Sequence, residues 1–149
     1  MDFDREMKRL KRKIDSGAEL IMTQPVYSIE TAEKFLDAVE PLGVPVLLGL
    51  CPLVSSRNAE FLHNEVPGMQ VPDDIRERMK AAGRGQPAID EGVEIAKEML
   101  DALKDRVVGC YIMPQLGKFC SALDILKDLG YGEPTCKDSS SSSVTNVVS

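Results

Sequence analysis

Polar side chains follow three apolar runs of the sequence, at the points where each run ends. Gln24 ends the first run, residues 55–58 follow the second, and Gln115 follows the third. Ligands of parallel α/β folds bind beside the carboxyl ends of the strands, so we expect these three places to converge on one face. The sequence has no metalloprotease, nucleophile-elbow, P-loop or dinucleotide-binding motif, and no complete catalytic set is visible.

Glutamine at the end of a strand has two interpretations. Its amide places one acceptor and two donors in one plane, which suits the recognition of a flat, amide-like heterocycle. The same side chain can instead cap a neighbouring backbone group. The pattern alone leaves both interpretations open for Gln24.

Other residues that could do chemistry carry weaker signals. The basic run Lys8, Arg9, Lys11, Arg12 and Lys13 is either a solvated helix face or a contact for a phosphate group. The single histidine, at position 63, could act as a base, but it lies in a polar connecting segment, which does not favour a catalytic role. The four cysteines, at positions 51, 110, 120 and 136, match no zinc-binding spacing. We therefore expect free thiols and a reducing, cytoplasmic setting.

The elements that would position these residues alternate between helix and strand. Apolar residues that recur at spacings of three and four predict amphipathic helices, and short continuous apolar runs predict buried strands. The predicted strands are 19–24, 44–52 and 106–114; the predicted helices are 3–15, 28–43, a short one capped by Ser55 or Ser56, 72–82, 87–104 and 119–130.

This order of elements, α-β-α-β-α-α-α-β-α, predicts an α/β fold. Helices separate the strands, and such long crossovers join parallel strands. An open doubly wound sheet and a piece of a (β/α)8 barrel both fit, although three strands cannot close a barrel of eight. Residues 133–149 have no periodicity and contain five consecutive serines, so we expect a domain over 1–132 and a disordered Ser-rich tail over 133–149.

The composition excludes several classes of function. The net charge of −6 argues against a nucleic-acid partner, which requires a basic footprint. No apolar stretch is long enough to span a bilayer, and the charged N-terminus lacks a signal-peptide pattern, so we expect no membrane partner. The hydrophobic share of 43% is sufficient for one core.

Three blocks of the chain resemble the methylenetetrahydrofolate reductase family. They match in order, cover about residues 4 to 130, and read "LKRKIDSGAELIMTQPVYSIETAEKFL", "VPVLLGLCPLVSSRNAEFLHNEVPG" and "GCYIMPQLGKFCSALDIL". The strings "TQPVY", "RNAEFLHNEVPG" and "YIMP" are most similar to the branch that is often fused to a homocysteine S-methyltransferase domain.

This resemblance implies a partial (β/α)8 TIM barrel, namely its C-terminal half with about three parallel strands and flanking helices. Family members bind FAD, which takes a hydride from NAD(P)H and passes it to 5,10-methylenetetrahydrofolate, giving 5-methyltetrahydrofolate. The family's general acid and most of its FAD contacts lie in the other half of the barrel. We therefore expect a fragment that is inactive alone and binds FAD weakly or not at all. The alternative is a non-catalytic half-barrel, or pseudo-enzyme, that acts by association with another subunit.

The resemblance also assigns residues to the folate substrate. Gln24 falls on a family glutamine that contacts folate and nicotinamide in turn, and Asn58 falls where some members carry a polar folate contact. Phe61 and Leu62 lie near an apolar residue that packs on the substrate. Gln115 stands where some members have an arginine, whose charge a glutamine cannot supply.

Two residues are assigned to the cofactor by the same resemblance. Lys13 matches a lysine that contacts FAD, and Glu6 lies near a family acid that also contacts it. No catalytic residue is expected within the chain. As partners we expect a second copy of the chain in a homo-oligomer, or the missing N-terminal half of the barrel.

Overall fold

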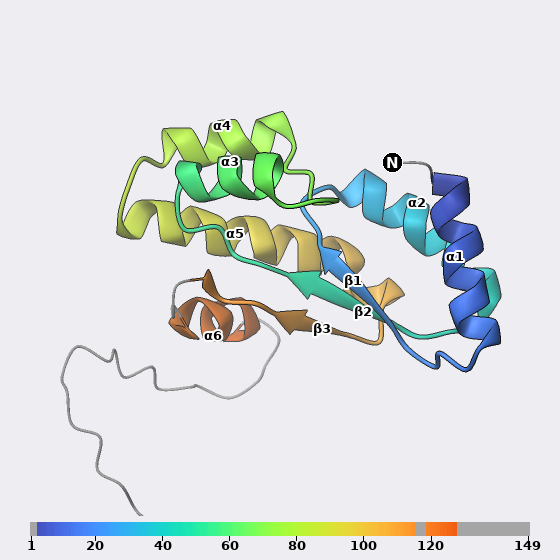
Figure 1. Ribbon diagram of the computed structural model, residues 1–149. Coiled ribbons are helices and arrows are strands. Elements are labelled where there is room, and N and C mark those ends of the chain that lie inside the picture. The colour runs from blue at the N-terminus through green and yellow to red at the C-terminus, as the bar shows by residue number, and fades with distance from the viewer. Residues whose placement is uncertain (1–2, 116–118, 128–149) are drawn as a thin grey trace, which may run out of the picture.

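The chain is described by a computed structural model, which covers residues 3–115 and 119–127 (Figure 1). Every predicted helix and strand is present, in the predicted order. The elements are α1 (Phe3–Asp15), β1 (Ile21–Pro25), α2 (Ile29–Val39), the 3-10 turn η1 (Glu40–Leu42), β2 (Val46–Leu50), α3 (Ser56–Glu65), α4 (Asp73–Ala81), α5 (Gln86–Leu103), the 3-10 turn η2 (Lys104–Arg106), β3 (Gly109–Ile112) and α6 (Phe119–Lys127). The predicted tail over 133–149 lies outside the described residues.

The three strands form one parallel sheet in the order β1-β2-β3, as the long helical crossovers predict. Ile21 pairs with Val46, and Leu48 pairs with Cys110. The structure is therefore the expected α/β arrangement of three parallel strands with flanking helices. Within the described residues, β1 and β3 each pair along one side only.

Serine side chains fix the beginnings of the two helices that follow β1 and β2. Ser28 accepts a hydrogen bond from the backbone N–H of Thr31 at the start of α2. Ser55, rather than Ser56, caps α3 by accepting from the backbone N–H of Asn58. Each cap supplies an acceptor for a backbone donor that the first turn of a helix leaves unpaired. The direction of each helix is thus set directly after a strand end.

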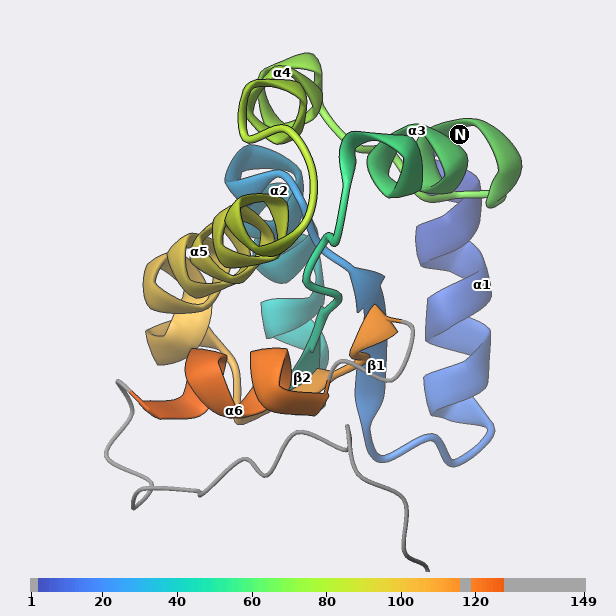
Figure 2. The ribbon, with the colours of Figure 1, turned by 90° about the vertical axis from the view of Figure 1, so that its left-hand side faces the viewer.

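One core lies between the sheet and the long helix α5. Figures 1 and 2 show α2 and α5 together on one face of the sheet. Leu48 and Leu50 of β2 are 1% and 0% exposed, and they pack in one cluster with Leu36 of α2 and Leu103 of α5. We call this face of the sheet the covered face, and the opposite face, which carries Met22, Leu47, Gly49 and Tyr111, the open face.

A second core joins α3 and α4 to the first half of α5. Leu53, Leu62 and Met79 are buried in it. A Cβ atom on Gly92 of α5 would lie 1.8 Å from the carbonyl oxygen of Leu53, so only glycine allows the helix to lie this close to the segment after β2. This contact holds the carboxyl end of β2 against α5.

The cysteines depart in part from expectation. Cys51 and Cys110 are free thiols, as expected. Cys120 is disulfide-bonded, so the prediction of a free thiol is wrong there. Spacing along the chain does not reveal which cysteines come close in space, and this is why the pattern missed the bond.

No helix among the described residues is both long and apolar enough to cross a membrane.

Candidate functional site

The carboxyl ends of the three strands meet at one edge of the sheet. Pro25 pairs with Gly49, and Leu50 pairs with Ile112. The backbone N–H of Met113 donates to the carbonyl of Leu50 at 2.8 Å, so β3 stays beside β2 as both end. The polar segments that follow these strands therefore start from one edge.

A β-bulge interrupts β1 between Met22 and Pro25, the interval that holds Thr23 and Gln24. The register advances by three residues on β1, from Met22 to Pro25, while β2 advances by two. The side-chain oxygen of Thr23 accepts the N–H of Gly49 at 2.9 Å, in place of a backbone carbonyl. Bulges next to functional sites re-aim a side chain. Gln24 is exposed at this point.

Gln115 and Tyr27 converge on Cys51, the first residue after β2. The side-chain amide of Gln115 donates to the Cys51 sulfur at 2.8 Å, and the Tyr27 hydroxyl donates to the Cys51 carbonyl at 2.8 Å. Burial raises the pKa of Tyr27 far above its ordinary value, which keeps this phenol a donor. Gln115 is thus engaged with Cys51, and these bonds tie the segments after all three strands together.

The residues assigned to substrate on α3 differ in their accessibility. Phe61 is 56% exposed and free to pack against a ligand, whereas Leu62 is 6% exposed and belongs to the second core. The side-chain oxygen of Asn58 accepts the backbone N–H of Val54 at 3.3 Å, so it shapes the segment after β2. Of these three side chains, Phe61 alone is presented to solvent.

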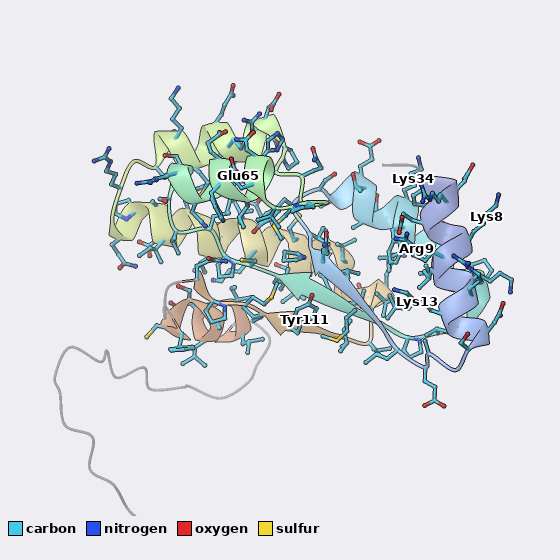
Figure 3. The ribbon with its side chains drawn as sticks, in the orientation of Figure 1. Lys8, Arg9, Lys13, Lys34, Glu65 and Tyr111 are labelled. Carbon is cyan, nitrogen blue, oxygen red and sulfur yellow. The ribbon has the colours of Figure 1, made fainter. Side chains whose placement is uncertain are left out.

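The residues assigned to the cofactor, Lys13 and Glu6, lie on α1. Figure 3 shows Lys13 at some distance from Tyr111, which lies in the sheet. Lys13 lines an open cavity of about 340 Å³ together with Arg9, Arg12 and Ser16. Glu6 accepts a hydrogen bond from Arg9 at 3.2 Å. Three cations beside one cavity suit an anionic group such as a phosphate.

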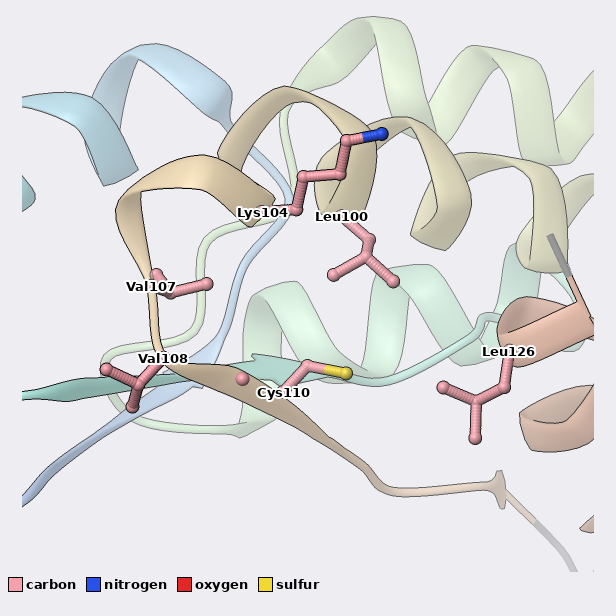
Figure 4. A pocket seen from close by; sticks show the side chains of 7 residues that line it. Leu100, Lys104, Val107, Val108, Cys110 and Leu126 are labelled. Atoms are coloured by element: carbon pink, nitrogen blue, oxygen red, sulfur yellow. The ribbon is translucent and has the colours of Figure 1, made fainter. Parts of the chain in front are cut away.

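A second cavity, of about 400 Å³, lies by the amino end of β3 (Figure 4). Its walls are mostly apolar: Leu100, Lys104, Val107, Val108, Gly109, Cys110 and Leu126. Lys104 is paired with Asp101 at 3.0 Å, and burial raises the pKa of the Cys110 thiol, which disfavours the reactive thiolate. This cavity lies away from the strand ends that carry Gln24 and Gln115.

His63 lies on α3 rather than in a connecting segment. Its Nδ1 atom accepts the backbone N–H of Val71 at 3.3 Å, which links α3 to the segment before α4. In residues 3–115 and 119–127, no cluster of three or more histidine, cysteine, aspartate or glutamate side chains could hold a metal ion.

Sequence reasoning did not find Tyr111, whose hydroxyl donates to the backbone carbonyl of Thr23. The feature of the sequence that could have pointed to this contact is Gly49, because a glycine near a strand end predicts that another group approaches the backbone closely. A Cβ atom on Gly49 would lie 2.8 Å from the Tyr111 hydroxyl oxygen. The sequence did not indicate which group approaches.

Comparison with known proteins identifies the family. A sequence model of the methylenetetrahydrofolate reductase family matches residues 1–130. The probable methylenetetrahydrofolate reductase (NADPH) of Caenorhabditis elegans is 24% identical over 86% of this chain and 20% of its own length. The probable methylenetetrahydrofolate reductase (NADH) of Oryza sativa subsp. japonica is 29% identical over 86% of this chain and 22% of its own length. The chain thus spans about a fifth of the length of these curated relatives.

A solved structure has a similar fold. It is an uncharacterized protein from Clostridium thermocellum described as binding two copies of 5-methyl-5,6,7,8-tetrahydrofolic acid, with a TM-score of 0.65 and 19% sequence identity. The likeness covers 88% of this chain and 50% of that one, and it concerns the fold. The sequence match carries the assignment: over residues 1–130, this chain belongs to the methylenetetrahydrofolate reductase family.

Proposed function

We propose that this chain is the C-terminal half of a folate-binding (β/α)8 barrel and contributes to the FAD-dependent reduction of 5,10-methylenetetrahydrofolate to 5-methyltetrahydrofolate with NAD(P)H. The chain is inactive alone in this proposal, because the general acid implied by the family resemblance lies in the other half of the barrel. Family membership supports the proposal, as does the folate named for the structurally similar protein.

The observation that carries the proposal is the exposure of Gln24 on a bulge at the carboxyl edge of the sheet. A primary amide there offers one acceptor and two donors to the planar pterin ring of a folate. Phe61, also exposed, would add apolar contact from α3. Three residues assigned to the substrate would support this surface without contacting the folate: Gln115 and Asn58 bond to the segment after β2, and Leu62 packs in the second core.

The residues of α1 fit part of FAD. Lys13, Arg9 and Arg12 would hold the diphosphate by charge, whereas Glu6 would act through its pairing with Arg9. Bound FAD would supply the hydride carrier between NAD(P)H and the folate. Because the resemblance places most FAD contacts elsewhere in the barrel, we expect weak binding. Flavin that co-purified with this chain at one per chain would contradict this part of the proposal.

We propose NAD(P)H as the reductant. The choice between NADH and NADPH stays open, because the name of one relative includes NADPH and that of another includes NADH. A cytoplasmic location is also part of the proposal. The free thiols of Cys51 and Cys110 agree with a reducing compartment, and the Cys120 disulfide counts against it.

Folate titration tests the proposal. Amide NMR spectra of the ¹⁵N-labelled chain would be recorded with increasing 5-methyltetrahydrofolate. We expect shifts at Gln24, Cys51 and Phe61, and a Kd of about 1 mM, since a partial site supplies only about −4 kcal/mol. Gln24→Ala should weaken binding about fivefold through the lost hydrogen bonds. Gln70→Ala, at an exposed glutamine between α3 and α4, is the matched control and should leave binding unchanged.

Two results would count against the folate proposal. One is a spectrum that does not respond to millimolar ligand. The other is an affinity that Gln24→Ala and Gln70→Ala leave equally intact.

The second candidate function is that of a non-catalytic half-barrel that associates with another subunit, either a second copy or a separate N-terminal half. Among residues 3–115 and 119–127, β1 and β3 each leave one side unpaired, which favours this function because unpaired strands invite pairing with another chain. Leu20 and Met22, 45% and 57% exposed, add apolar surface beside β1. Light scattering after size-exclusion chromatography should then show a dimer or larger species. A monomer at all concentrations would exclude self-association.

A further inference from the structure

The bulge in β1 leaves one backbone carbonyl outside the regular ladder. The N–H of Gly49 bonds to the Thr23 side chain, and the N–H of Val26 bonds to the Gly49 carbonyl at 3.1 Å. The Thr23 carbonyl is instead bonded by the Tyr111 hydroxyl, which comes from β3 on the far side of β2. This bond is partly buried, and leaving such a carbonyl without a partner costs at most about 1–3 kcal/mol, so the bond stabilises the bulged conformation.

Gly49 makes this crossing possible. It pairs with Tyr111 in the sheet, and a Cβ atom there would lie 2.8 Å from the Tyr111 hydroxyl oxygen and 2.9 Å from the Thr23 carbonyl oxygen. Any larger residue at position 49 would separate the Tyr111 hydroxyl from the Thr23 carbonyl. The same Cβ atom would lie 3.0 Å from the carbonyl carbon of Gln24. The bond therefore lies directly beside the residue that the bulge presents.

We propose that Tyr111 is a positioning residue for Gln24: its hydroxyl, passing over Gly49, holds the bulged peptide of Thr23 and so fixes the direction in which Gln24 meets its ligand. This inference deepens the proposed function and rests on it for the identity of the ligand. Figure 3 shows Tyr111 within the sheet, on a strand different from that of Gln24. Without the hydroxyl, Gln24 would remain exposed but would sample several directions.

The protonation state of Tyr111 agrees with this role. Burial raises the pKa of Tyr111, so the phenol remains a hydrogen-bond donor at neutral pH. A carbonyl partner needs such a donor.

The test compares Tyr111→Phe with Tyr27→Phe. Each variant removes one hydroxyl that donates to a backbone carbonyl, but Tyr27 bonds to Cys51 rather than to Thr23. The first readout is the backbone ¹⁵N order parameter of Gln24 without ligand, which Tyr111→Phe should lower from about 0.85 towards 0.6. The second is the affinity for 5-methyltetrahydrofolate, which Tyr111→Phe should weaken about fivefold. Tyr27→Phe should leave the order parameter of Gln24 at its wild-type value, because Tyr27 does not bond to the bulged peptide.

Each outcome decides the proposal. A rigid Gln24 in Tyr111→Phe overturns the proposal, as does an unchanged affinity in that variant, or an equal loss of order at Gln24 in Tyr27→Phe. If the wild-type chain binds no folate, the proposed function fails, and the order parameter of Gln24 alone then decides whether Tyr111 positions it.

Two measurements keep the test independent of how well Tyr111→Phe folds. Gly49→Ala places a methyl group between the hydroxyl and the carbonyl, and it should also loosen Gln24. In the wild-type chain, the hydroxyl proton of Tyr111 should exchange slowly and show a nuclear Overhauser effect to the α-protons of Gly49. A fast-exchanging hydroxyl without this effect would overturn the proposal.

Discussion

The two faces of the sheet differ in what they contact. On the covered face, Ile21, Leu48 and Leu50 are at most 7% exposed and pack under α2 and α5. On the open face, Met22 is 57% exposed, and Leu47 belongs to neither core cluster. The helices of a (β/α)8 barrel cover the outside of its sheet. The open face therefore corresponds to the interior of the proposed barrel.

This difference separates stability from function within one sheet. Side chains of the covered face bury apolar area and stabilise the fold. The open face instead contains a glycine, a bulge and a phenol bonded to a backbone carbonyl, all next to Gln24. Substitutions on the two faces should therefore change different quantities.

The largest effect is expected on the covered face. Leu48→Ala removes a side chain that is 1% exposed, and it should lower the free energy of unfolding by about 3 kcal/mol through lost burial and the cavity left behind. Met22→Ala on the open face should lower it by about 0.5 kcal/mol. Urea unfolding followed by circular dichroism measures both. Similar losses would show that the open face is also packed.

Gly92→Ala tests how the second core is held to α5. The added Cβ atom would meet the carbonyl of Leu53, so α5 must move, which should lower the free energy of unfolding by about 2 kcal/mol. Glu94→Ala, at an exposed position of the same helix, is the control and should change stability by at most about 0.5 kcal/mol. Thermal unfolding that ranked the two variants equally would contradict the close contact.

The smallest effect is expected for an ion pair between α4 and α5. Arg78 donates to both carboxylate oxygens of Glu98, at 2.7 and 2.8 Å, and these bonds lower the pKa of Glu98 against the opposing effect of burial. The Glu98 side chain is 44% exposed, so solvent screens the pair, and Glu98→Gln should cost about 0.5 kcal/mol at pH 7.

The sign of the pH dependence follows from the lowered pKa. Glu98 stabilises the fold above its unfolded-state pKa, and this contribution is lost as the pH falls through the lower folded-state value. The stability difference between wild type and Glu98→Gln should therefore shrink as the pH falls below about 4.5. A difference that grew in acid would contradict the bonding geometry.

Apolar residues predicted the elements because a helix buries one face, at spacings of three and four, and because short continuous apolar runs are typical of buried strands. The apolar runs overestimated strand lengths, since Leu20 and Val108, 45% and 66% exposed, lie just before the first residues of β1 and β3. The bulge could not be predicted, because it depends on pairing with β2 rather than on β1 alone.

Only the part of the candidate site that follows from the order of strands and helices along the chain could be predicted. Parallel crossovers place Gln24 and Gln115 at the same edge of the sheet. The bond between Tyr111 and Thr23 joins residues 88 positions apart, and no local pattern encodes it. Leu62 was assigned to the substrate by resemblance, although its spacing of three from Ala59 fits the buried stripe of α3 on which both residues lie.

Methionine methyl groups offer the most direct test of whether ligands approach the open face. Met22 and Met113 are 57% and 39% exposed, whereas Met79 and Met99 are at most 4% exposed. In the chain labelled with ¹³C at its methionine methyl groups, millimolar 5-methyltetrahydrofolate should shift or broaden the signals of Met22 and Met113 and leave those of Met79 and Met99 unchanged. Signals that all stayed in place, or a response confined to Met79 and Met99, would contradict the central claim that the folate binds at the carboxyl edge of the sheet, beside its open face.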